Sequence, residues 1–157
     1  VAHAGRTNFE NERLRFFEDT GSALEVPLDR DLFMTQGGIQ CMEDPLETLA
    51  SIWGLGFRFV YLTRIEVCDT LASPVIVRLL DRLSANGPGP VPADLVDRDT
   101  SYPATFFPTS TLFDAIPRSY HLRFTFMESD PRERMIGKEI HATRKIGLLL
   151  ERSSGST

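Results

Sequence analysis

The chain has little cysteine and little lysine. The shortage of cysteine limits the metal sites and disulfides that it can form, and the shortage of lysine leaves arginine to carry the positive charge. Among 157 residues there are 2 cysteines, Cys41 and Cys68, and they form no CxxC pair. Two isolated thiols do not complete a tetrahedral zinc site, so we expect no metal centre. We expect two buried, reduced thiols, although a single disulfide is an alternative that the sequence does not decide.

The sequence also lacks long apolar runs and short catalytic motifs. No run approaches the roughly 20 residues of a membrane span, and the N-terminus has no apolar segment typical of a signal peptide. We therefore expect a chain that works inside a cell or in a virion. There is no GxSxG, HExxH or phosphate-binding glycine loop, so the sequence predicts no cofactor and favours a non-enzymatic role.

The positive charge is carried almost entirely by arginine. Lys138 and Lys145 are the 2 lysines among 17 cationic residues, and the formal net charge is −5. This acidic balance disfavours nucleic acid as the main partner. The arginine excess has two interpretations, a GC-rich coding bias and a preference for the bidentate contacts that arginine makes at interfaces.

The hydrophobic pattern predicts one short helix and several strands. Asp44, Pro45 and Glu47 form a helix start before apolar residues at helical spacing up to Trp53. Alternation predicts strands over Phe57–Val67, Val75–Leu83, Tyr120–Phe126 and Lys138–Arg152. The first two of these strands are close enough in sequence to pair as a hairpin. Leu24–Met34 and Thr100–Thr111 are expected to be edge strands or extended segments because each contains proline.

Short strands, few helices and proline-rich connections predict a mainly β fold. We expect an antiparallel β-sandwich, a jelly roll or a barrel, with one or two short helices. The length is that of a single domain over residues 1–157, with flexible ends at about 1–7 and 152–157.

Histidine provides the candidates for acid–base chemistry. Glu139 and His141 are two residues apart on a predicted strand, so their side chains leave the same face. If that strand pairs with the one containing His121 and Arg123, the four side chains could converge, with His141 as base or metal ligand and Glu139 as its orienting group. The alternative is that these are ordinary residues on a polar sheet face.

Arginine and phenylalanine provide the candidates for partner binding. Five arginines are predicted on the less apolar face of strands, namely Arg58, Arg64, Arg78, Arg82 and Arg123. Such a face fits an acidic protein surface, unless local carboxylates such as Glu66 neutralise it. Phe106 and Phe107 are adjacent, so on a strand one of them must face outward, where either a partner or a second layer of the same domain would cover it.

The order of these features is similar to that of jelly-roll virus capsid subunits. An extended N-terminal arm comes first, then a short helix at Asp44–Trp53 leading into a strand, then strands joined by proline-rich loops. A first residue Val1 is compatible with release from a polyprotein. The resemblance implies an oligomeric assembly subunit or protein-binding domain, with the surfaces of Arg58, Arg64, Arg123, Phe106 and Phe107 as contacts. The alternative is a small β domain with a pocket, binding an apolar ligand or using His121, His141 and Glu139.

Overall fold

The computed structural model describes residues 2–26, 31–85 and 96–153. They fall into two compact units, residues 1–30 and 31–157. The first unit contains helices α1 (Ala2–Phe9) and α2 (Thr20–Leu24). A helix therefore occupies most of residues 1–7, which we expected to be a flexible end. The helix is held because Gly5 lies against the ring of Phe16, and Arg6 bonds the Phe16 carbonyl and pairs with Glu18 at 3.3 Å.

The second unit contains every strand that the structure describes. Its elements, in order, are β1 (Leu32–Gln36), η1 (Ile39–Cys41), α3 (Pro45–Gly54), β2 (Phe59–Val67), β3 (Val75–Arg82), η2 (Leu83–Ala85), β4 (Asp99–Phe106), α4 (Thr109–Asp114), β5 (Tyr120–Met127), β6 (Arg132–Ile136) and β7 (Glu139–Arg152). The mainly β prediction is confirmed, with few and short helices. Among the described residues, no helix is long and apolar enough to span a membrane.

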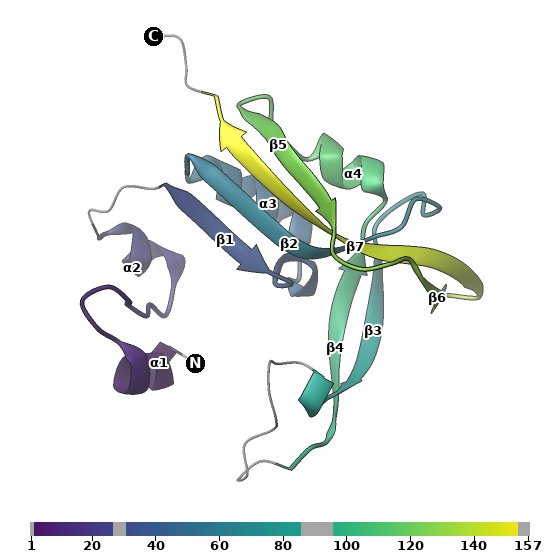
Figure 1. Cartoon of the computed structure of the whole chain (residues 1–157), viewed down its shortest axis with the longest axis horizontal. Coiled ribbons are helices and arrows are strands. Elements are labelled where there is room, and N and C mark those ends of the chain that lie inside the picture. Colours follow the sequence, from purple (N-terminus) through teal and green to yellow (C-terminus); the bar gives the residue numbers. More distant parts are fainter. Residues whose placement is uncertain (1, 27–30, 86–95, 154–157) are drawn as a thin grey trace. The chain divides into compact units, whose positions relative to one another are not determined.

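Two sheets form from these strands. A 5-stranded sheet has the order β1-β2-β7-β5, with β6 paired to the first half of the long strand β7 (Figure 1). β3 and β4 form a separate antiparallel pair. The predicted hairpin between β2 and β3 does not form, because both edges of β2 are already hydrogen-bonded, to β1 on one side and β7 on the other.

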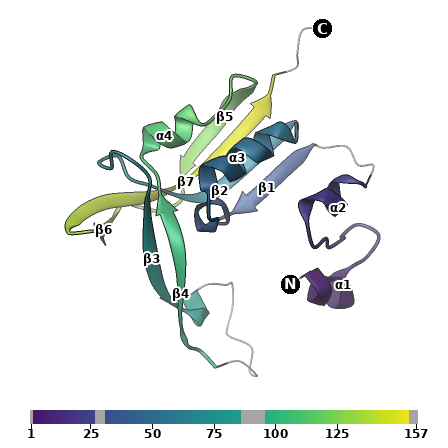
Figure 2. The ribbon, with the colours of Figure 1, turned by 180° about the vertical axis from the view of Figure 1, so that it is seen from behind.

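The larger sheet is not purely antiparallel. β1 and β2 are parallel neighbours, and α3 connects them as a crossover helix. α3 begins where the sequence predicts, with Asp44 accepting a hydrogen bond from the Glu47 amide and Pro45 in the first turn. α3 and α4 lie on the same side of this sheet (Figure 2). Helices rather than a second sheet therefore cover its buried face, which differs from the predicted sandwich of strands.

An irregularity in β2 decides which side chains are buried. The pairing with β7 shifts register between Leu62 and Ile65, and Arg64 there has φ of 57°. Val60 and Leu62 are buried before the shift, and Ile65 and Val67 after it. A strict two-residue alternation places Val60 and Leu62 on the same face as Arg58 and Arg64, which the sequence predicts to be the less apolar face. That assignment is wrong because the bulge exchanges the faces midway along the strand.

The core has two parts that meet at the end of β4. The larger lies between the sheet and helices α3 and α4, and includes Phe107; the smaller lies under β3 and β4, and includes Phe106. Both side chains have 0 % exposure, so the second of the two expected covers, another layer of the same domain, is the one that the structure shows. The strand's two faces are each covered by a different core at this point. Neither residue is available to a partner in this fold.

Candidate functional site

The structure brings Glu139 and His141 together as their spacing predicts. Glu139 Oε2 lies 3.6 Å from His141 Nε2, and the histidine is buried while the carboxylate is exposed. The other ring nitrogen, Nδ1, lies 2.7 Å from the hydroxyl of Thr70. That hydroxyl also lies 3.2 Å from the thiol of Cys68. The result is a hydrogen-bonded series from Cys68 through Thr70 to His141, with the Glu139 carboxylate near the other ring nitrogen.

His121 does not join this group. β5 does pair with β7, but the partner of His121 is Glu151, near the opposite end of β7 from His141. His121 Nε2 instead lies 2.9 Å from the Ser153 hydroxyl. The three residues predicted for acid–base chemistry therefore occupy two separate places, because β7 is long enough for its halves to pair with different strands.

The five arginines predicted on one face are also divided. Arg78 and Arg82 belong to the β3–β4 pair, where Arg78 bonds Ser101 and Arg82 lies 3.6 Å from Asp99. Arg123 pairs with Glu151 at 2.6 Å. Arg58 and Arg64 are exposed, and the guanidinium of Arg58 lies 4.9 Å from the centre of the Phe59 ring. Glu66 pairs with Lys145 rather than with an arginine.

The side of the larger sheet opposite α3 and α4 carries a row of apolar side chains. Residue pairing aligns one residue from each of four strands, Met34, Tyr61, Leu149 and Phe124. Met34 is 64 % exposed and Phe124 is 58 % exposed. We call this row and its apolar neighbours Leu32, Phe59 and Phe126 the open face; Figure 1 is drawn from this side. An exposed apolar surface of this kind is typical of a binding site.

The aromatic rings of the open face pack on one another. Phe126 is stacked with Tyr61 at 6.1 Å between ring centres and with Phe124 at 5.6 Å. The ring of Phe126 also covers Gly147 on β7. These contacts fix the positions of the rings on this side of the sheet. The charged residues Arg58, Arg123 and Glu151 lie at one end of the face, so its centre is free of charge while its rim is charged.

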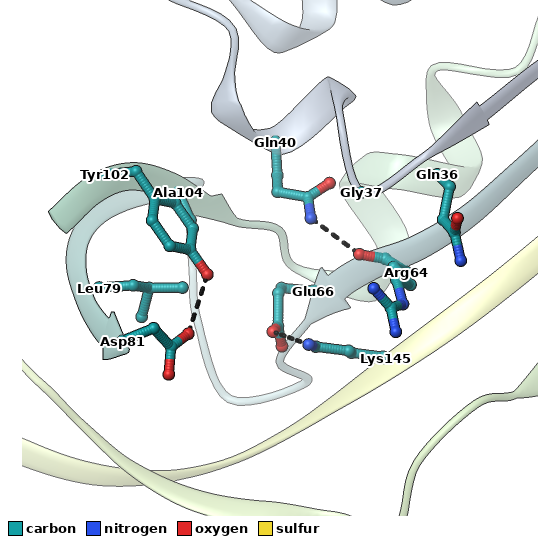
Figure 3. A pocket seen from close by; sticks show the side chains of 10 residues that line it. All are labelled: Gln36, Gly37, Gln40, Arg64, Glu66, Leu79, Asp81, Tyr102, Ala104 and Lys145. Carbon is teal, nitrogen blue, oxygen red and sulfur yellow. Dashed lines mark hydrogen bonds and ion pairs between the residues drawn. The ribbon is translucent and has the colours of Figure 1, made fainter. Parts of the chain in front are cut away.

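A second candidate is a polar pocket where η1 and the two sheets meet. Its volume is about 260 Å³. Its polar lining comes from η1, β2, β3, β4 and β7, and includes Gln40, Glu66, Asp81, Tyr102 and Lys145 (Figure 3). Burial and a hydrogen bond to Asp81 raise the pKa of Tyr102, which therefore stays a hydrogen-bond donor. None of His121, His141 and Glu139 lines this pocket.

Sequence reasoning missed both surfaces for identifiable reasons. The open face depends on the parallel pairing of β1 and β2, which aligns Met34 with Tyr61. The pocket depends on Glu66 being buried, and the bulge at Arg64 places it there. A polar Glu66 within an apolar strand was the available signal. Among the described residues, no three histidine, cysteine or acidic side chains are grouped so that they could hold a metal ion.

Comparisons with known proteins identify no relative of this chain. No protein-family model, no curated protein and no solved structure matches it.

Proposed function

We propose that this chain is a non-enzymatic assembly subunit, and that two copies associate through the open face. The observation that carries the proposal is the aligned apolar row across β1, β2, β7 and β5, exposed on a sheet whose other side packs against helices α3 and α4. The proposal keeps the assembly role of a capsid-type subunit. It replaces the jelly-roll arrangement by a sheet backed by α3 and α4.

The size of the open face supports a dimer. Three strongly exposed side chains, Leu32, Met34 and Phe124, and four half-buried ones contribute to it. With about 200 Å² for each large side chain, the exposed apolar area is roughly 500 Å² per copy, or about 1,000 Å² for two copies. Rim residues add to this total. That reaches the lower end of the range in which specific interfaces are found.

The distribution of charge favours a second copy as the occupant. A twofold-symmetric interface brings a surface against itself, so any charge at its centre would meet a like charge. The central row, from Met34 through Tyr61 to Phe124, has no charge, and sheets with such faces pack about 10 Å apart. Arg58, Arg123 and Glu151 stay at the rim, where charges are normally found in interfaces.

Sedimentation equilibrium of the full chain and two variants tests the proposal. Phe124→Glu puts a charge in the central row. We expect the dissociation constant of the dimer to rise about a hundredfold, because association would bury an unpaired charge. Met127→Glu is the matched control. Met127 is 64 % exposed on the same strand, but it aligns with Ile146 on the helix-covered side.

Two results would contradict the proposal. One is a wild-type chain that remains monomeric at millimolar concentration. The other is a dimer that Phe124→Glu and Met127→Glu weaken equally. Association with a different protein, in place of self-association, would also reject the second copy as the occupant of the open face.

A further inference from the structure

The polar pocket contains a buried carboxylate with few partners. The side chain of Glu66 is 4 % exposed, and its closest described cation is Lys145, with 3.5 Å between Glu66 Oε1 and Lys145 Nζ. Glu66 and Lys145 face each other across β2 and β7. A buried carboxylate normally accepts several short hydrogen bonds, and among the described residues Glu66 has this one long ion pair. The pocket side of the carboxylate therefore has acceptor capacity left over.

Gln40 adds a second acceptor without a donor. Its amide nitrogen donates to the Arg64 carbonyl at 2.8 Å, which fixes the direction of the amide. Its Oε1 atom is buried and has no hydrogen-bond partner in the described part of the chain. Gln40 is 7 % exposed, and Figure 3 shows its amide nitrogen directed at the Arg64 carbonyl and its oxygen on the other side of the amide. Leaving a buried carbonyl unpaired is unfavourable, so this position calls for a hydrogen-bond donor.

Asp81 supplies a third acceptor from the opposite wall. Asp81 Oδ2 accepts from the Tyr102 hydroxyl at 3.1 Å, which orients the carboxylate beside the pocket. Gln40, Glu66 and Asp81 come from η1, β2 and β3, so the fold itself brings these acceptors to one cavity. A primary ammonium group has three donors and a positive charge, and it matches a cavity lined by three such acceptors, two of which are carboxylates.

The remaining lining determines the rest of the ligand. Arg64 and Lys145 balance the two carboxylates, so the lining has no net charge and would not favour a simple cation. They provide donors for a carboxylate on the same molecule. Leu79 and Ala104 give the pocket an apolar part. A volume of about 260 Å³ is below that of drug-sized pockets, which limits the ligand to a small molecule.

We infer that this pocket binds a free α-amino acid with a small aliphatic side chain. The ammonium group lies among Gln40, Glu66 and Asp81, and the carboxylate lies toward Arg64 and Lys145. The aliphatic side chain contacts Leu79 and Ala104. This site is separate from the open face, and the inference does not depend on self-association.

Isothermal titration of the full chain with L-leucine tests the inference. We expect saturable binding of one molecule per chain. N-acetyl-L-leucine lacks the ammonium group and leucinamide lacks the carboxylate, so each should bind at least about tenfold more weakly. The absence of saturable L-leucine binding up to about 10 mM would overturn the inference, and so would equal binding of all three compounds.

Two variants locate the binding site. Glu66→Gln keeps the shape of the side chain and removes its charge, and Asp81→Asn does the same on the exposed wall. Each should weaken L-leucine binding at least about tenfold. Glu133→Gln on β6, outside the pocket, is the matched control and should bind normally. Asp81 is exposed, so its variant keeps the test valid if Glu66→Gln does not fold. Unchanged binding by Asp81→Asn would reject the site.

Discussion

The ring of Phe126 lies over Gly147 so closely that a β-carbon at position 147 would overlap it. β5 and β7 pair these two residues directly, and the missing side chain of the glycine makes room for the ring. Because Phe126 also stacks on Tyr61 and Phe124, the glycine positions the whole aromatic group of the open face.

Gly147→Ala should therefore displace Phe126 and disturb the open face. We expect the free energy of unfolding to fall by about 1–3 kcal/mol, as for other overpacked sites. Denaturant unfolding gives this value. Gly54→Ala is the control, since nothing lies within 4 Å of a β-carbon there and α3 should tolerate or gain from alanine. Equal stability of the two variants would show that Phe126 does not depend on the glycine.

Truncation of Phe106 and truncation of Phe107 should destabilise different parts of the fold, although the two residues are neighbours in sequence. Each is fully buried, so truncation to alanine should cost about 3–5 kcal/mol. Phe106→Ala empties the smaller core, and amide exchange should accelerate mainly in β3 and β4. Phe107→Ala empties the larger core, and exchange should accelerate in β2 and α4. The same exchange pattern in both variants would mean that the two cores unfold as one.

Arg64 occupies a backbone conformation that glycine adopts more easily. Its φ is 57°, and its backbone N–H donates to Glu128 Oε1 at 3.0 Å, a bond that a glycine would keep. Arg64→Gly should raise the free energy of unfolding by about 1 kcal/mol, while Arg64→Val should lower it, because a branched side chain is strained there. Thermal unfolding of both variants measures the difference. A less stable glycine variant would contradict the role given to the bulge.

Asp69 should contribute to the acid sensitivity of the fold. A hydrogen bond from the Thr109 hydroxyl, with further help from Arg144, lowers the pKa of Asp69 below its ordinary value of 3.8. A carboxyl whose pKa is lowered by folding stabilises the protein above pH 3.8, and this contribution is lost as the pH falls below that value. Asp69→Asn should lose stability at neutral pH and show a smaller further loss between pH 4 and pH 2. An unchanged difference between neutral and acid stability would contradict this assignment.

Much of the local structure could be predicted from the sequence. The helix at Asp44 has a capping residue, a proline and a glutamate in the expected order, and α3 begins there. The alternating runs predict β2, β3, β5 and β7 to within a few residues. These signals depend only on residues that are near one another in sequence, so they hold whatever the arrangement of the elements in the fold. β6 and α4 escaped prediction because each is short and follows a proline, which reads as a turn.

The arrangement of these elements could not be predicted in the same way. The bulge at Arg64 reverses the faces of β2, and alternation alone cannot show where a register shift falls. His121 lies on β5, which pairs with β7, and His141 lies on β7 itself. The length of β7 nevertheless separates the two histidines. The pairing of Glu139 with His141 was predictable because it depends only on spacing along one strand. Thr70, which completes that group, comes from a loop far away in sequence.

Light scattering during size-exclusion chromatography gives the absolute mass of the full chain in solution, and so shows whether two copies associate. We expect a dimer, with twice the 17.7 kDa mass of one chain, and a shift toward the monomer in Phe124→Glu. A wild-type chain that elutes with the mass of one chain at every concentration would contradict it.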